Sequence, residues 1–308
     1  MPTAAPDPRE LPEIRVRGNP ALSVRVREGE GVPIVLLHGL GRTLEDWEPI
    51  ALLLGRNHPL YAVDQRGHGL SEDGAWFLDG YVDDLIRVIG HFGLKQPVVV
   101  GHHLGGMVAA LYGTRREDLT AVVNIEGHGW PRAESVAEGL GLSPENAQHQ
   151  VTAVRRFAVE HLASVAAPMP LDAFERLVEG LRSGPLGMPG AVLEASVHRA
   201  VTAERDVVSP RPGPRAIRAL CRALDEFEPD RVDRELRVPA LTLVSTVPLP
   251  LVPGAPLRLH DVLSAQAAHE LTARTGQLTV RGVDAPHTMH LSHPDTVASH
   301  IEDFLHAV

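Results

Sequence analysis

The 308-residue sequence has one cysteine, one lysine and no long hydrophobic run, and these scarcities exclude several classes of protein. Because a single cysteine cannot form a disulfide within the chain, Cys221 excludes a disulfide-stabilised scaffold. Cys221 lies in a periodic apolar run, which favours a role as a small core residue. No segment approaches the roughly 18 consecutive apolar residues that a membrane helix needs.

Basic side chains are also in the minority, with 29 of them against 39 acidic ones and a formal net charge of −10. Such a surface repels phosphate backbones and anionic lipids, so we predict no nucleic-acid partner and no membrane partner. The first residues lack the cationic and apolar segments of a secretory signal, and we expect residues 1–12 to form a loose arm. These features predict a cytoplasmic protein and leave its oligomeric state open.

Hydrophobic residues make up 44% of the sequence and charged residues 22%, which is ordinary for a globular protein. Short apolar runs alternate with amphipathic stretches, a pattern typical of parallel strands that are buried on both faces and joined by helices. A hairpin is predicted around Asn19-Pro20. The later predicted strands are Pro33–Leu37, Leu60–Val63, Pro97–Val100, Ala121–Ile125, Ala240–Val244 and Gln277–Val283. The predicted helices between and after them are Leu44–Leu54, Tyr81–Phe92, Leu104–Tyr112, Val262–Thr275 and Pro294–Leu305.

Residues 129–232 interrupt this alternation. Amphipathic pieces such as Ala147–Val165 and Leu171–Leu181 occur there, and no strand-like run stands out. We therefore predict a core formed by residues 1–128 and 233–308, with residues 129–232 as a helical insertion.

Histidine follows five of the predicted strands. In open α/β sheets, ligands bind at the carboxyl ends of the strands, so these positions indicate a site without naming its reaction. The residues are His38, His68, His102 with His103, His128 and His287.

The segment Gly101-His-His-Leu-Gly105 follows an apolar strand and opens a helix. Small residues at both ends of this segment are typical of a strained strand-to-helix turn that carries its middle residue, His103, at the helix N-terminus. Histidine is among the non-glycine residues that tolerate a positive φ. The backbone N–H groups of Leu40 and Leu104 are candidates for an oxyanion-stabilising pair.

Four segments stand in the order and spacing of known motifs: VPIVLLHGLGRTLEDW, AVDQRGHGLS, VVVGHHLGGMVAALYG and APHTMHLSHP. With them the sequence resembles the α/β-hydrolase superfamily over about residues 14–128 and 236–306. The resemblance implies an α/β-hydrolase fold, with a mostly parallel sheet, helices on both faces and a helical cap at residues 129–232. It also implies that His287 is the catalytic histidine.

The sequence departs from the superfamily at two positions. His103 stands where the family carries a nucleophilic serine, aspartate or cysteine. The loop that usually supplies the acid, after the strand Ala240–Val244, contains no carboxylate. In haloalkane dehalogenases and some other relatives, the acid follows the preceding strand, and the resemblance then implies Glu126 as the partner of His287. Asp284 is too near His287 in the sequence to be favoured.

Two imidazoles with a carboxylate behind one of them favour general acid–base chemistry, such as elimination, lyase, cyclisation or water activation. His103 could instead attack an acyl group as a nucleophile. Other readings are a binding protein without catalysis, a metal site formed by His103, His287 and Glu126, or a serine hydrolase in which serine was exchanged for histidine.

The substrate is expected to be a small-to-medium, largely apolar organic molecule, because an apolar cap covers the site. We predict neither a cofactor nor a metal. The candidates for lining the pocket are His38, His102, Trp47, His128 and Trp130. Structural roles are an alternative for three of these candidates. His38 could stabilise its turn, His102 could pack beside the helix that follows His103, and Trp47 could be an ordinary core residue.

Overall fold

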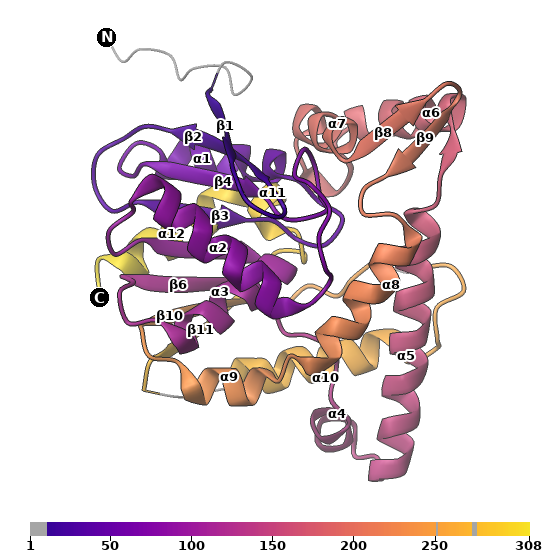
Figure 1. The fold of residues 1–308 in the computed structure, drawn as a ribbon. Coiled ribbons are helices and arrows are strands. Elements are labelled where there is room, and N and C mark those ends of the chain that lie inside the picture. The colour runs from indigo at the N-terminus through magenta and orange to yellow at the C-terminus, as the bar shows by residue number, and fades with distance from the viewer. Residues whose placement is uncertain (1–10, 251, 273–275) are drawn as a thin grey trace.

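The computed structural model describes residues 11–250, 252–272 and 276–308. Its centre is an eight-stranded sheet with the order β1-β2-β4-β3-β5-β6-β10-β11 (Figure 1). β2 pairs antiparallel with β1 and β4, whereas all later neighbours are parallel, which confirms the predicted mostly parallel sheet. The strands are β1 (Glu13–Val16), β2 (Leu22–Arg27), β3 (Ile34–Leu37), β4 (Leu60–Asp64), β5 (Val98–His102), β6 (Ala121–Ile125), β10 (Ala240–Ser245) and β11 (Leu278–Val283).

Side chains of the parallel strands alternate between two hydrophobic cores. In β3, Val35 and Leu37 belong to one core, and Ile34 and Leu36 belong to the other. Because helices cover both faces, no position of such a strand needs a polar side chain, which explains the uninterrupted apolar runs. The first core contains α2 (Leu78–Phe92) and α3 (Leu104–Arg115), and the second contains η2 (Leu44–Trp47), α1 (Glu48–Leu54), α11 (Met289–Ser292) and α12 (Pro294–Leu305).

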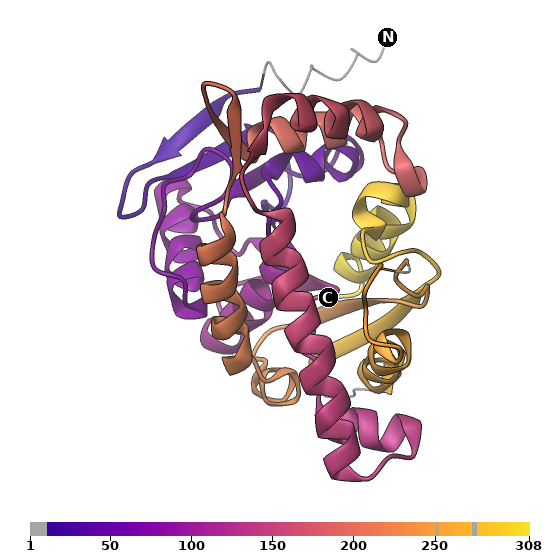
Figure 2. The same ribbon diagram turned by 90° about the vertical axis from the view of Figure 1, so that its right-hand side faces the viewer.

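The segment between β6 and β10 forms the cap, in which α5 and α8 lie side by side (Figures 1 and 2). These two helices share an apolar cluster that includes Ala163 and Cys221. The core helix α10 (Leu259–Thr272) packs against α4 and α5 through Val262. The cap helices are α4 (Ala133–Leu140), α5 (Pro144–Val165), α6 (Leu171–Arg182), η3 (Pro185–Gly187), α7 (Gly190–Arg199), α8 (Pro214–Ala223) and η4 (Leu224–Glu226).

The cap is mainly helical, as predicted, but it also contains a three-stranded antiparallel sheet with the order β7-β9-β8, which the sequence did not predict. The strands are β7 (Met169–Pro170), β8 (Val201–Glu204) and β9 (Val207–Pro210). Only Val208 among their residues is buried, against Phe174 and Val178 of α6. Strands of two to four residues with one buried side chain leave no recognisable apolar run.

The predicted end of the cap at residue 232 falls inside α9 (Pro229–Glu235), whose Val232 belongs to the core cluster around α3. The predicted loose arm lies mostly outside the described residues. Pro12, at its end, is tied to the sheet, because its carbonyl oxygen accepts a hydrogen bond of 3.0 Å from the Val26 N–H. None of the helices within the described ranges is both long and apolar enough to cross a membrane.

Candidate active site

His103 occupies the turn between β5 and α3 with φ 49° and ψ −111°. Two glycines allow this turn. A Cβ atom on Gly101 would lie 2.0 Å from the carbonyl oxygen of Gly105, and one on Gly105 would lie 2.1 Å from the carbonyl oxygen of Leu37. The His103 N–H also donates a 2.8 Å hydrogen bond to the carbonyl oxygen of Ile125, which joins the turn to β6.

The end of β6 carries Glu126, which has φ 60° and binds two segments of the chain. His287, in the loop after β11, donates from Nδ1 to Glu126 Oε2 over 2.8 Å. The Ser245 N–H donates to Oε1 over 2.5 Å. The last residue of β10, directly before the loop that contains no carboxylate, thus contributes a backbone donor to the carboxylate of Glu126.

Glu126 is ionised in this setting. Burial opposes the charge, but hydrogen bonds from His128 and His287 outweigh it and hold the pKa of Glu126 well below its ordinary value. A carboxylate at Nδ1 fixes the ring orientation of His287 and stabilises its protonated form, leaving Nε2 as the atom that can exchange a proton.

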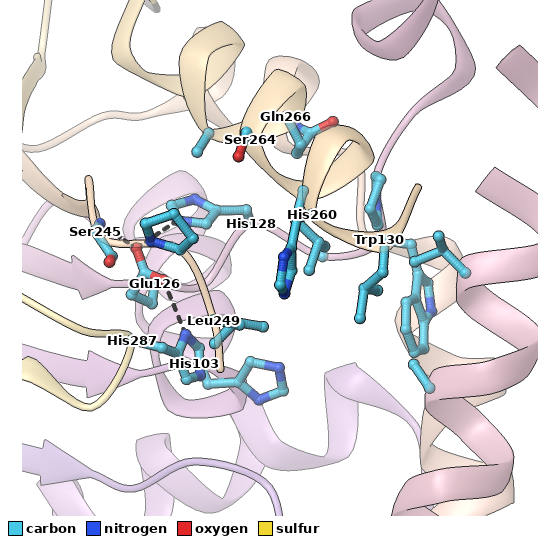
Figure 3. A pocket seen from close by; sticks show the side chains of 18 of the residues that line it. His103, Glu126, His128, Trp130, Ser245, Leu249, His260, Ser264, Gln266 and His287 are labelled. Atoms are coloured by element: carbon cyan, nitrogen blue, oxygen red, sulfur yellow. Dashed lines mark hydrogen bonds and ion pairs between the residues drawn. The ribbon is translucent and has the colours of Figure 1, made fainter. Parts of the chain in front are cut away.

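His103 and His287 are neighbours with nearly perpendicular rings, whose centroids are 5.6 Å apart. Burial, reinforced by the nearby His287, lowers the pKa of His103 to about 3, so its ring is neutral at physiological pH. Within the described part of the chain, no side-chain hydrogen bond engages the His103 ring, which points into a cavity (Figure 3).

This cavity has a volume of about 480 Å³ and lies between the strand ends, α5, α8, α10 and the loop after β10. No arginine or lysine occurs among the described residues that line it. The side chain of His260 points into it from α10 (Figure 3), and the buried Nε2 atom of His260 has no hydrogen-bond partner among the described residues. The apolar wall includes Leu40, Met107, Trp130, Val154, Phe157, Leu162, Leu224, Leu249, Val252, Leu259 and Leu263.

Two of the five predicted pocket residues, His128 and Trp130, line the cavity, and the other three do not. His38 is fully buried in the turn, where its Nδ1 donates to the Gly39 carbonyl oxygen over 2.7 Å and its Nε2 accepts from the Gln65 N–H. A pocket role for His38 is thus replaced by the structural alternative.

His102 and Trp47 lie behind the cavity wall. His102 is buried, with its ring 4.8 Å from that of His287, and its Nε2 donates to the His287 carbonyl oxygen over 3.1 Å. Trp47 is fully buried and packs on His290, with ring centroids 5.1 Å apart. Trp47 belongs to the second hydrophobic core, and neither side chain reaches the cavity because both are buried.

The two segments that carry the predicted oxyanion pair lie side by side. A Cβ atom on Gly39 would stand 3.4 Å from the Cβ atom of His103, and the Leu40 side chain lines the cavity. Leu104 is the first residue of α3, directly after His103. The oxyanion role of the Leu40 and Leu104 N–H groups stays a prediction.

The geometry does not support the hypothesis that His103, His287 and Glu126 form a metal site. Within the described residues, no group of three or more His, Cys, Asp or Glu side chains is placed to hold a metal ion. His103, His287 and Glu126 are adjacent, but Nδ1 of His287 is already engaged by the carboxylate.

Sequence reasoning missed the contribution of α10. His260, Gln266 and Glu270 belong to this helix, whose position depends on apolar contacts with α4 and α5. These residues carry no local motif. The one signal in the sequence was the presence of several polar side chains in a helix that is otherwise apolar enough to be buried.

Residues 34–300 match the profile of the alpha/beta hydrolase family. The chain belongs to this family. The match includes both departures noted in the sequence, the histidine at the elbow and the empty acid loop. It confirms the predicted superfamily and identifies the chain as an alpha/beta hydrolase family enzyme.

Several characterised proteins are similar to parts of the chain. A non-heme haloperoxidase of Rhodococcus erythropolis is 37% identical over 28% of this chain, an alignment that spans 33% of the haloperoxidase. A 2-(acetamidomethylene)succinate hydrolase of Mesorhizobium japonicum is 28% identical over 61% of this chain and 72% of its own length. Epoxide hydrolase B of Mycobacterium tuberculosis is 32% identical over 37% of this chain and 33% of its own length.

Solved structures resemble the whole chain. The crystal structure of an E-2-(acetamidomethylene)succinate hydrolase has a TM-score of 0.70 at 18% identity, covering 96% of this chain and 99% of the other. A putative epoxide hydrolase from Pseudomonas aeruginosa has a TM-score of 0.63 at 22% identity, covering 99% and 98%. At these identities the likeness shows the fold alone.

Proposed function

We propose that this enzyme acts on a small-to-medium, largely apolar organic molecule by general acid–base chemistry at His103, His287 and Glu126. The observation that carries the proposal is the 2.8 Å hydrogen bond between His287 and Glu126 beside a neutral His103. This hydrogen bond supports a role for His287 and Glu126 as a proton-transfer pair, while position 103 lacks a serine, aspartate or cysteine to receive an acyl or alkyl group.

In the proposed reaction, Nε2 of His287 removes a proton from water or from a C–H or O–H group of the substrate. The electron pair of the broken O–H or C–H bond stays on the atom that lost the proton and forms the new bond. The bond to the leaving group breaks, and the leaving group keeps the electron pair of that bond. The imidazolium formed on His287 is stabilised by the ionised Glu126 and returns its proton to the leaving group. His103, kept neutral, donates or accepts a hydrogen bond at the reacting group without carrying a charge.

Activation of water is the first reaction to test, because the names of the relatives describe hydrolases of a succinate and of epoxides. Elimination, lyase and cyclisation reactions need the same base and remain within the proposal. They differ from hydrolysis in whether water enters the product.

The cavity supports an uncharged substrate. A succinate carries two carboxylates, whereas the described lining of this cavity offers no arginine or lysine to bind them and contains the ionised Glu126. The ring nitrogens of His128, which also lines the cavity, already face the carboxylates of Glu126 and Glu270. The apolar wall suits a hydrophobic body. The unpaired Nε2 of His260 supports one hydrogen-bonding group at the α10 side of the substrate.

The test is a panel of uncharged esters, lactones and epoxides assayed with the wild-type protein and with His103→Ala, His287→Ala and Glu126→Gln. We expect turnover of at least one class and a loss of about 10²–10⁴-fold in kcat/KM in the variants. His91→Ala, at an exposed position of α2, is the control and should retain activity. Full activity in His103→Ala and His287→Ala would contradict the proposal.

Intact-mass measurement after incubation with an activated ester separates the alternatives. General acid–base catalysis leaves the mass unchanged, whereas nucleophilic attack by His103 would add an acyl group that is absent in His103→Ala. Tight binding of a compound that is recovered unchanged, with no turnover in the panel, would support a binding protein instead.

A further variant tests what a serine would do at position 103, where the family carries its nucleophile. His103→Ser places a hydroxyl at the elbow beside His287 and Glu126, and we expect it to hydrolyse p-nitrophenyl esters through an acyl-serine detectable by mass. His103→Ala, which has the same elbow without a hydroxyl, is the control. If both variants are equally inactive, the His287–Glu126 pair is not aligned for proton transfer from the elbow.

A further inference from the structure

Glu126 binds a second histidine on the side away from His287. His128, two residues later in the chain, donates from Nε2 to Glu126 Oε1 over 3.3 Å. The His128 side chain is 13% exposed and lines the cavity. One buried carboxylate is therefore shared by two imidazoles, through its two different oxygens.

The opposite nitrogen of His128 faces another buried carboxylate. His128 Nδ1 lies 3.8 Å from Glu270 Oε2, and the side chain of Glu270, on α10, is 5% exposed. Glu270 is held in place because its Oε1 accepts a 2.6 Å hydrogen bond from Gln266 Nε2. Gln266 is in turn fixed by the Arg132 N–H, which donates to its Oε1 over 3.0 Å.

His128 is the cation available to both carboxylates. Neither Glu126 nor Glu270 forms an ion pair with an arginine or lysine in the described ranges, and their charged partners there are histidines. Two buried carboxylates without a cation are costly, so this arrangement favours a protonated His128. Burial opposes the charge, yet Glu126, Glu270 and Asp233 together raise the pKa of His128 above its ordinary value.

The other titratable groups around His128 do not replace this charge. Asp233, on α9, is itself neutralised in part, since burial and the charges of Glu270 and Asp230 raise its pKa to about 7. Asp230 pairs with His269 of α10 over 3.3 Å at the outer side. On the cavity side stand His103, which is neutral, and His287, which is bound to the same Glu126.

We propose that His128 is a positioning residue, held as an imidazolium between Glu126 and Glu270, that limits how strongly Glu126 stabilises protonated His287. This inference rests on the proposed function of the His287–Glu126 pair. The positive charge on His128 offsets part of the Glu126 charge. His287 therefore gives up its proton more readily, which restores the base for the next turnover.

The central test needs no substrate. The protonation of His128 and His287 is followed by NMR of ring-labelled histidine between pH 5 and 9, with signals assigned through His128→Gln and His287→Gln. In the wild-type protein we expect the titration midpoint of His128 to lie above the ordinary histidine value of about 6.5. In Glu270→Gln, which keeps the shape of the side chain, its midpoint should fall by about one pH unit or more.

The same experiment measures the effect on His287. In His128→Gln, loss of the positive charge should move the titration midpoint of His287 upward by about one pH unit, and Glu270→Gln should move it in the same direction. Glu302→Gln is the matched control, because Glu302 pairs with a different histidine, His58, over 3.3 Å, and it should change neither midpoint. Circular dichroism checks that each variant is folded. If His128→Gln does not fold, Glu270→Gln still tests the proposal.

The outcomes separate this inference from the proposed function. A His128 that titrates at or below pH 6.5, or that is unaffected by Glu270→Gln, overturns the inference. An unchanged His287 midpoint in both variants also overturns it. Absence of turnover in the substrate panel would instead overturn the proposed function, because neither NMR titration involves catalysis. Where turnover is found, the acid limb of the kcat/KM profile should move upward in both variants and stay unchanged in Glu302→Gln.

Discussion

Histidines at the strand ends of this protein fall into three electrostatic settings. His38 and His68 are buried in a turn, and burial is the main cause that lowers the pKa of each. His103 is neutral and faces the cavity. His128 differs because two carboxylates flank its ring. One residue type thus serves different purposes according to its surroundings, and spacing in the sequence does not distinguish them.

The neutral state of His103 predicts a stability effect in acid. Between about pH 6.5 and pH 3, the unfolded chain binds a proton at this position that the folded protein does not bind, so acidification favours unfolding. This residue alone should contribute up to about 1.4 kcal/mol per pH unit to the decline in the free energy of unfolding. His103→Ala should therefore lose stability less steeply than the wild-type protein.

Urea denaturation at pH 7, 6 and 5 measures the slopes. His91→Ala, at an exposed position, should follow the wild-type slope. Parallel lines for wild type and His103→Ala would mean that His103 is protonated in the folded protein as readily as in the unfolded chain.

At the scale of elements, the tight junction between β5 and α3 rests on close backbone approach. A Cβ atom on Gly105 would stand 2.1 Å from the Leu37 carbonyl oxygen, a contact that requires α3 to move away from β3. Gly90, in α2, has no atom within 4 Å of the corresponding position. A side chain therefore has room at Gly90 but not at Gly105, although both glycines lie within helices.

Gly105→Ala is expected to lower the free energy of unfolding by about 1–3 kcal/mol or more, because the backbone cannot relax as a side chain can. Gly90→Ala is the matched control and should be neutral or stabilising by about 0.5–1 kcal/mol, since alanine favours the helix. Urea denaturation distinguishes the two. Equal effects would show that the β5–α3 junction is looser than its contacts indicate.

The elements themselves differ in how far the sequence predicts them. Strands such as β3 and β6 were predicted within one residue or two, because burial on both faces demands continuous apolar runs. The cap strands β8 and β9 could not be predicted, since Val208 is the one fully buried residue in them and neither strand forms an apolar run. The contact between His287 and Glu126 was expected from the resemblance to the α/β-hydrolase superfamily, some members of which carry their acid at the position of Glu126. Glu270 was not expected, since its approach to His128 depends on how α10 packs.

At the scale of the whole molecule, an arginine of the cap joins it to the sheet. Arg199, at the end of α7, binds Asp64 over 2.7 Å and Glu13 over 2.8 Å, and its side chain is 9% exposed. Asp64 also accepts the Leu44 and Leu70 N–H groups, so it is a buried anchor of its turn. These contacts fix the β-containing half of the cap against the N-terminal hairpin.

Arg199→Met should lower the free energy of unfolding by about 2–3 kcal/mol, because it leaves the buried Asp64 without its cation. The loss is smaller than for a fully buried pair since Glu13 keeps some access to water. Arg176→Met is the control, because the Arg176–Asp172 pair is exposed to water and should contribute little to stability. Equal denaturation midpoints for both variants would refute a role for Arg199 as a link between cap and core.

The elbow has a consequence for how this enzyme can change. Its sharp bend is maintained by Gly101, by Gly105 and by the backbone bond from His103 to Ile125, none of which involves the side chain at the apex. The conformation of the turn therefore does not depend on which side chain stands at position 103. Residues that tolerate its positive φ should be exchangeable there at little cost in stability and without remodelling of the sheet.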